Sequence, residues 1–224
     1  MKLSIIIPTL DEEGSLGRTL ISLSVHALEI IIVDGGSRDN TVGIARQYTP
    51  HVLSSERGRG SQQHKGACYA QGDLLLFLHS DTVLPKNFEM MIQKTLSDPQ
   101  VTLGAFRLSI HPSRPVLKLI ALMANLRSRL LKMPYGDQAL FMRRSDYFRV
   151  GGFKGLPLME DVDLVRRLNG IGRFMLTEDS VMTSARRWEK EGTLYTTLRN
   201  WSLIVKYLLG NPPHNLVRFY SDLR

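Results

Sequence analysis

Leu74-Leu75-Leu76-Phe77-Leu78-His79-Ser80-Asp81-Thr82 is the stretch around which this sequence is organised. Its apolar residues end abruptly in a histidine, a hydroxyl, a carboxylate and a second hydroxyl. An apolar run this short favours a strand that is buried on both faces, as in the middle of a parallel sheet. Such sheets bind ligands at the carboxyl ends of their strands, so Asp81 is placed where a metal or a phosphate would bind. Alternatively, Asp81 has a purely structural role and only caps the next turn.

Shorter apolar runs precede this stretch, and helical patterns separate them. Strands are expected at residues 3–7, 29–33 and 51–54, and helices at 15–25, 39–48 and in a segment that ends at residue 70. Strands that alternate with helices in this way predict an α/β fold, in which right-handed crossovers join the strands of a parallel sheet.

Carboxylates recur where these strands end. Asp11, Glu12 and Glu13 follow the first strand, Asp34 ends the second, and Asp81 follows the fourth. Because parallel strands end at the same edge of a sheet, we expect these side chains to lie close together. Scattered surface acids would have no reason to recur at strand ends, so the pattern favours a functional role for Asp81.

The second half of the chain is less regular. Helices are expected at residues 86–96, 115–131, 145–150 and 160–168, and strands at 101–110, 139–142 and 172–177. Leu194, Leu198, Trp201, Val205 and Leu208 form a helical stripe in the tail. Internal repeats and low-complexity linkers are absent from the sequence, so we predict one domain over residues 1–224.

Composition excludes several protein classes. The 224 residues are 43% hydrophobic, as in soluble proteins with a substantial core. Cys68 is the single cysteine, which excludes an internal disulfide framework and a Cys-based zinc site and suits a reducing compartment. The N-terminal apolar run is too short for a signal peptide, and no run reaches the roughly 18 apolar residues of a membrane span. We therefore predict a cytoplasmic protein.

The formal net charge of +8 is compatible with nucleic acid, an anionic membrane surface or phosphate-bearing substrates. The basic residues are scattered in pairs such as Arg143-Arg144 and Arg166-Arg167 rather than gathered in one tract. No zinc-finger or RNA-recognition signature accompanies them. We therefore predict no nucleic-acid partner.

Six motifs follow one another between residues 3 and 188. They are Ile5-Ile6-Ile7-Pro8-Thr9-Leu10-Asp11-Glu12-Glu13, Ile32-Val33-Asp34-Gly35-Gly36-Ser37-Arg38-Asp39-Asn40-Thr41, His79-Ser80-Asp81, Gly136-Asp137-Gln138, Glu160-Asp161 and Arg187-Trp188. In this order they resemble the motifs of family 2 glycosyltransferases of the GT-A fold, of the small single-domain bacterial type. The resemblance implies a mostly parallel nucleotide-binding sheet flanked by helices. Residues 1–100 would bind a nucleotide sugar, and residues 101–224 would form the acceptor half and the C-terminal helices.

The resemblance also implies an activity. A sugar would pass from a nucleoside-diphosphate sugar, expected to be a UDP-sugar, to a hydroxyl acceptor with inversion and with help from Mg²⁺ or Mn²⁺. The acceptor would be a sugar, a lipid-linked compound or a small molecule. The predicted donor-binding residues are Pro8, Thr9, Glu12, Glu13, Asp34, Gly35, Arg57, Ser80, Asp81 and Arg187, with Asp81 also binding the metal. Asp161 would be the general base with Glu160 beside it, and Asp137, Gln138 and Trp188 would contact the acceptor.

These residue types suit that chemistry. Carboxylates accept hydrogen bonds from ribose hydroxyls and nucleobase N–H groups. A divalent ion on oxygen ligands neutralises a diphosphate leaving group. Attack on an anomeric carbon needs an acceptor hydroxyl that gives up its proton, and a carboxylate within hydrogen-bond reach takes it.

The sequence departs from the family pattern at two positions. His79 stands where the first acid of the DxD motif is expected, so the metal position survives without that acid's ribose contact. Ser184 stands where the QxxRW motif has its glutamine, which is typical of processive synthases with membrane helices. A transferase that adds a single sugar fits this chain better.

Several alternatives stay open at this stage. A nucleotidyltransferase of related fold would need a glycine-rich, basic loop after the first strand, and a catalytically silent nucleotide-binding scaffold would tolerate His79. Arg57 and Arg59 fit either a phosphate clamp or a solvated loop, and Trp188 fits either packing or substrate contact. The helix at residues 116–131 fits a core, a lid or the inner surface of a membrane. The tail stripe fits a membrane or a homodimer face equally well.

Overall fold

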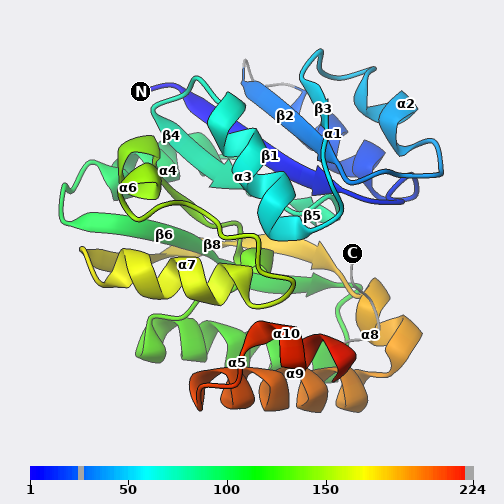
Figure 1. The fold of residues 1–224 in the computed structure, drawn as a ribbon, viewed down its shortest axis with the longest axis vertical. Helices are drawn as coiled ribbons and strands as arrows, with labels where there is room; N and C mark the ends of the chain where they lie inside the picture. The colour runs from blue at the N-terminus through cyan, green and yellow to red at the C-terminus, as the bar shows by residue number, and fades with distance from the viewer. Residues whose placement is uncertain (25–27, 220–224) are drawn as a thin grey trace.

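A computed structural model describes residues 1–24 and 28–219 of this chain. In these residues eight strands form one sheet in the order β3-β2-β1-β4-β7-β6-β8-β5 (Figure 1). The strands are β1 Leu3–Thr9, β2 Glu29–Asp34, β3 Val52–Ser54, β4 Leu74–Phe77, β5 Thr82–Val83, β6 Val101–His111, β7 Phe141–Arg143 and β8 Arg173–Ser184. The helices are α1 Leu16–Leu23, α2 Thr41–Ala45, α3 Arg59–Tyr69, α4 Phe88–Leu96, α5 Pro115–Leu131, α6 Arg144–Arg149, α7 Glu160–Asn169, α8 Arg186–Glu191, α9 Thr193–Leu208 and α10 Pro213–Leu216, with 3₁₀ turns η1 Gly136–Gln138 and η2 Val217–Phe219.

The first four strands are parallel, as the sequence predicts. β1 lies between β2 and β4, and Ile6 pairs with Ile31 on one side and with Phe77 on the other. Every residue of β1 is buried because strands cover both of its edges and helices cover both of its faces. The predicted strand runs at 3–7, 29–33, 51–54 and 74–78 are confirmed with small changes at their ends.

Alternate side chains of the buried strands supply two separate cores. Leu74, Leu76 and Leu78 pack with residues of α1, α4 and α5 on one face of the sheet. Leu75 and Phe77 pack with residues of α3 and α7 on the other face. A strand with apolar side chains at every position is required for this arrangement, which explains the unbroken run of leucines.

The predicted helix at 39–48 is shorter in the structure, where α2 spans Thr41–Ala45. Asp39 does not enter this helix, because its carboxylate accepts hydrogen bonds from the N–H and the hydroxyl of Thr41. The predicted end of the first helix at residue 25 lies outside the described residues.

The second half mixes strand directions. β7 runs antiparallel to both β4 and β6, and β5 runs antiparallel to β8, so only the first half of the sheet is wholly parallel. β8 continues to Ser184, well beyond the predicted end at residue 177. A bulge explains this error, because Ala105 pairs with Leu176 while Arg107 pairs with Ser180. The extra polar residues in the bulge interrupt the apolar pattern, yet the strand resumes and brings Ser184 beside β5.

Helix α5 lies against β6, with α9 beside it (Figure 1). Leu117 and Ala121 of α5 are buried in the core. The side chain of Asn125 pairs with Leu108 of β6, accepting from its N–H at 2.7 Å and donating to its carbonyl at 3.0 Å. The predicted helix at 115–131 is therefore confirmed as one that packs on the sheet through one face.

We expect Gly104→Ala to destabilise the fold. Gly104 of β6 pairs with Phe141 of β7, and a Cβ at this glycine would lie 2.1 Å from the Phe141 ring. Overpacking of a core typically costs about 1–3 kcal/mol, so the free energy of unfolding in urea should fall by that amount. Gly14→Ala is the matched control, because apart from Gly14 and its two chain neighbours no atom of the described residues lies within 4 Å of the added methyl group. Equal stability of the two variants would contradict this packing.

Candidate active site

The carboxyl ends of β1, β2 and β4 meet at one edge of the sheet. Thr9 and Asp34 are paired in register, and the Thr9 hydroxyl donates to an oxygen of Asp34 at 3.2 Å. Ser80 and Asp81 follow β4 at the same edge, since β4 is paired in parallel with β1. The predicted convergence of polar residues at this edge is therefore observed.

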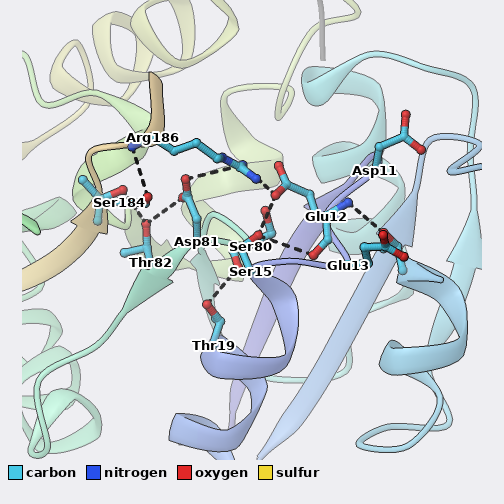
Figure 2. Close-up of polar contacts among 12 residues, drawn as sticks. Asp11, Glu12, Glu13, Ser15, Thr19, Ser80, Asp81, Thr82, Ser184 and Arg186 are labelled. Carbon is cyan, nitrogen blue, oxygen red and sulfur yellow. Dashed lines mark hydrogen bonds and ion pairs between the residues drawn. The ribbon is translucent and has the colours of Figure 1, made fainter. Parts of the chain in front are cut away.

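One guanidinium group bridges two of the carboxylates (Figure 2). Nη2 of Arg186 lies 2.7 Å from Oε2 of Glu12 and 3.8 Å from Oδ2 of Asp81. Glu12 comes from the loop after β1, Asp81 from the turn after β4, and Arg186 from the first residue of α8. A positive charge from the C-terminal half thus lies between two carboxylates from the N-terminal half.

Hydrogen bonds hold both carboxylate loops in place. The Ser15 hydroxyl donates to Glu12 Oε2 at 2.6 Å, and the Glu12 N–H donates to the hydroxyl of Thr41 at 2.7 Å. The Thr19 hydroxyl donates to the Ser80 carbonyl at 2.8 Å, which ties the Asp81 turn to α1 (Figure 2). The two acids are therefore positioned before any ligand binds.

Two adjoining cavities open around these groups. The first is lined by Pro8, Thr9, Leu10, Glu12, Arg59, Gln62, His79, Ser80, Asp81, Asp137, Thr183, Ser184, Arg186, Arg187, Trp188 and Asn200. The second has apolar walls from Leu158, Val162, Leu203 and Ile204, together with the acids Glu160 and Asp161. Arg59, His79, Asp137, Arg187 and Asn200 line both cavities, so the two spaces meet at these side chains.

Asp137 lies where the two cavities meet. Its Oδ1 atom is buried and has no hydrogen-bond partner among the described residues. Burial raises the pKa of Asp137, Arg127 opposes that shift, and the neighbouring charge of Asp161 adds to it. A buried oxygen without a partner is costly, so it marks a place where a ligand hydroxyl would bind.

Glu160 and Asp161 occupy the first turn of α7. Met159 has a left-handed backbone conformation (φ 65°) that turns the chain into this helix. Asp161 accepts hydrogen bonds from the N–H groups of Gly136 and Val162, both at 2.8 Å, which fix its side chain at the start of the helix. Glu160 lies 3.5 Å from Arg59, and burial raises the pKa of Glu160.

The donor set at the first cavity suits a hard divalent cation. Glu12 and Asp81 offer carboxylate oxygens, which Mg²⁺ and Mn²⁺ prefer, and they already share a cationic guanidinium. No cluster of three or more acidic, histidine or cysteine side chains in the described residues forms a complete metal cage. A metal here would need further ligands from a bound anion or water.

Most predicted site residues line the cavities, and a few do not. Pro8, Thr9, Glu12, Ser80, Asp81, Asp137, Glu160, Asp161, Arg187 and Trp188 are cavity residues. Glu13, Asp34, Gly35, Arg57 and Gln138 lie outside both cavities.

Three of the outlying residues organise the loops beneath the site. Asp34 accepts hydrogen bonds from the N–H groups of Gly36 and Ser37 at 2.9 Å, and Glu13 accepts one from Asn40 at 2.9 Å. The N–H of Gly35 donates to the Thr9 carbonyl at 2.9 Å.

The prediction that Gln138 contacts the acceptor is wrong. Its side chain is completely buried, accepting from the Ser128 hydroxyl at 2.6 Å and donating to the Phe106 carbonyl at 3.0 Å. Gln138 therefore fixes the turn that presents Asp137. The predicted Arg57 is likewise displaced, because Arg59 is the arginine of its loop that lines the cavities.

Sequence reasoning missed several cavity residues. Gln62 of α3 donates from Nε2 to the carbonyls of Thr9 and Val33, both at 2.8 Å, and joins the helix to the strand ends. Asn200 reaches the site from α9. Neither residue belongs to a recognised motif. Arg186 had a signal, since it adjoins Arg187 in the same basic pair.

Comparison with known families identifies the pattern. A family model described as Glycosyl transferase family 2 matches residues 4–156 of this chain. A 4,4'-diaponeurosporenoate glycosyltransferase of Staphylococcus haemolyticus is 27% identical over 93% of this chain and 66% of its own length. A glucosyl-3-phosphoglycerate synthase of Petrotoga mobilis is 27% identical over 45% of this chain. The match covers only 37% of the Petrotoga protein.

Solved structures show the same fold. TarS of S. aureus in complex with UDP-GlcNAc has a TM-score of 0.68 and 19% identity, covering 82% of this chain and 58% of that chain. The mannosyltransferase PcManGT of Pyrobaculum calidifontis, in complex with GDP-Man and Mn²⁺, has a TM-score of 0.66 and 19% identity. That match covers 82% of this chain and 56% of that chain. These likenesses confirm the predicted GT-A fold.

We expect Asp137→Asn to raise the unfolding temperature at neutral pH. The raised pKa of Asp137 means that the folded state pays for ionising this carboxyl once the pH exceeds the ordinary value of 3.8. The stabilising effect of the amide should therefore be largest at neutral pH, shrink as the pH falls, and vanish below 3.8. Calorimetry across this range tests the sign. Asp179→Asn, on an exposed part of β8, should show no such trend; a gain that grows toward acid pH would refute the assignment.

Proposed function

The chain belongs to glycosyl transferase family 2, and from this we propose that it transfers a sugar from a nucleoside-diphosphate sugar to a hydroxyl acceptor. The observation that carries the proposal is the cation shared by Glu12 and Asp81 at the carboxyl edge of the sheet. This edge is where open α/β sheets bind nucleotides. The protein would work in the cytoplasm, at the inner face of a membrane.

The donor would occupy the first cavity. Pro8, Thr9 and Glu12 would contact the nucleoside, and the arginines of α8 would face the diphosphate. Guanidinium groups suit this task because they donate several parallel hydrogen bonds to phosphate oxygens. We propose a UDP-sugar, a donor class supported by the complex of TarS with UDP-GlcNAc. The Pyrobaculum neighbour, in complex with GDP-Man, makes guanosine donors the comparison to test.

A bound Mg²⁺ or Mn²⁺ would neutralise the negative charge that develops on the diphosphate leaving group. Asp81 would hold this ion, with Glu12 close by. Arg186 already compensates these carboxylates in the absence of a ligand, so it would turn from them to the phosphates when the donor binds. The complex of PcManGT with GDP-Man and Mn²⁺ supports metal use in this fold.

Asp161 would take the proton from the acceptor hydroxyl. It lines the second cavity, whereas Asp81 and Arg186 line the first. The attacking hydroxyl would therefore reach the sugar from the second cavity, and the diphosphate would leave into the first. That arrangement suits a single displacement, which inverts the anomeric centre.

The acceptor would bind where the cavities meet. Asp137 Oδ1, Trp188 Nε1 and Asn200 Oδ1 are buried atoms with no hydrogen-bond partner among the described residues. Asp137 and Asn200 line both cavities and Trp188 lines the first, so two acceptors and one donor are available to the hydroxyls of a sugar or a similar polyol. A nucleotidyltransferase is disfavoured, because Glu12 and its acidic neighbours occupy the loop where a basic glycine-rich segment would be required.

We expect Asp81→Asn to remove metal-dependent nucleotide binding. UDP with Mn²⁺ should raise the unfolding temperature of the unsubstituted protein, and this increase should be largely lost in the variant because the amide carries no charge for the ion. Thermal-shift measurements with UDP and GDP, with and without Mn²⁺, test this. Asp179→Asn should retain the full increase. Equal increases in the two variants would exclude Asp81 as the metal ligand, and no response to any nucleotide would favour a silent scaffold.

We expect Asp161→Asn to lower kcat for sugar transfer about 10²–10⁴-fold, the range over which general bases contribute. Binding of UDP with Mn²⁺ should be unchanged, which shows that the variant is folded. Glu160→Gln should lose much less activity, because Glu160 pairs with Arg59 and is not the residue proposed to take the proton. Product formation from a panel of UDP-sugars measures both. Full activity of Asp161→Asn would reject its role as the base.

A further inference from the structure

The outer face of α9 is a continuous apolar stripe. Leu194, Leu198, Trp201, Val205 and Leu208 recur at helical spacing, and each of them is exposed. Leu198 alone exposes 68% of its surface. Thr196 and Leu203, on the opposite face, are buried against the rest of the molecule. The buried side of α9 thus mixes polar and apolar residues, whereas its exposed side carries the apolar stripe.

Helix α5 repeats this arrangement beside α9. Its exposed apolar residues are Val116, Leu119, Leu122, Met123, Leu126, Leu130 and Leu131. α5 and α9 contact each other and lie together at one end of the molecule, remote from β3 and α2 (Figure 1). Their exposed side chains therefore make one end of the protein unusually apolar. We call the exposed residues of these two helices the α5–α9 face.

The distribution of charged residues indicates what the α5–α9 face would contact. Residues 99–136 and 192–219 contain no aspartate or glutamate, although the chain has 21 acidic residues. Lys118 and Arg129 are exposed on α5 among the leucines, and Lys132 ends the helix. Aromatic side chains, including the half-exposed Trp201, add the residue type that favours the boundary between water and lipid. No helix in the described residues is long and apolar enough to cross a membrane.

We propose that the α5–α9 face binds the surface of an anionic lipid bilayer. Apolar residues would enter the boundary between headgroups and acyl chains, and the surrounding lysines and arginines would pair with anionic headgroups. A second copy of the chain would bring the same positive charges together, because two identical faces would meet. Charge therefore favours the bilayer over a homodimer.

The same helix connects this surface to the reaction site. Asn200, Leu203 and Ile204 on the inner side of α9 line the second cavity, while Leu198 and Trp201 face outward. Bilayer binding would thus place the apolar second cavity about one helix diameter from the lipid. This inference rests on the proposed transferase function. The geometry points to an acceptor whose hydroxyl is attached to an apolar chain in the membrane.

Flotation with lipid vesicles tests the charge requirement. The chain of 224 residues should float with vesicles that contain phosphatidylglycerol, bind poorly to pure phosphatidylcholine, and dissociate as salt is raised. Lys118→Glu/Arg129→Glu should weaken partitioning at least about tenfold. The control Lys86→Glu/Arg149→Glu makes the same change in net charge at exposed sites elsewhere and should bind nearly as well as the unsubstituted protein. An equal loss of vesicle binding in both variants would show that only net charge matters and would overturn the proposal.

A second pair of variants tests the apolar stripe. Leu198→Gln/Trp201→Gln should weaken partitioning about tenfold or more, whereas Ile21→Gln/Met90→Gln, which changes exposed apolar residues of α1 and α4, should not. Sedimentation of the free protein identifies the competing occupant. A dimer that Leu198→Gln/Trp201→Gln dissociates, in a protein that does not float with vesicles, would assign the face to a second copy.

The outcome does not depend on catalysis, because flotation needs neither donor nor turnover. Asp161→Asn should float normally even if it cannot transfer sugar. An active enzyme that ignores anionic vesicles would overturn the membrane proposal and leave the transferase proposal standing. A protein that floats with anionic vesicles but never binds a nucleotide would overturn the transferase proposal and leave the membrane proposal standing.

Discussion

The ion pair between Arg186 and Glu12 joins residues 174 positions apart in the chain. Glu12 is almost completely buried at the end of the parallel sheet, and a buried carboxylate without a partner is strongly destabilising. The ion pair therefore links the parallel half of the fold to a cation from the second half. The long strand β8 positions Arg186, because its last residue, Ser184, lies beside β5 and the Asp81 turn and accepts a hydrogen bond from the Arg186 N–H.

Much of the parallel half could be predicted from the sequence. Strands buried on both faces need apolar side chains at every position, and that pattern is visible without a structure in residues 3–7 and 74–78. The second half could not be predicted as well. β5 is too short to show a period, and β8 is interrupted by a polar bulge whose residues resemble a turn. In both cases pairing with a neighbouring strand, rather than local preference, decides the conformation.

The candidate site also contains residues that the sequence predicts and residues that it does not. Glu12, Asp81 and Asp161 follow strands or begin a helix, so topology places them correctly even before the geometry is known. Gln62 and Asn200 enter from helices, where one polar residue that faces inward gives no signal in the sequence. Gln138 illustrates the opposite error. It belongs to the same short motif as Asp137, yet adjacent residues of a tight turn point in different directions, and only Asp137 reaches the cavities.

Helix α9 has two faces with separate tasks, one lining a cavity and the other exposed. Because neighbouring positions on a helix point about 100° apart, substitutions at Leu198 or Trp201 leave Asn200 and Leu203 where they are. If the exposed face binds lipid as proposed, substitutions there would alter membrane attachment and leave the cavity wall unchanged. Membrane attachment and the shape of the cavity would then vary independently, although one short helix carries both.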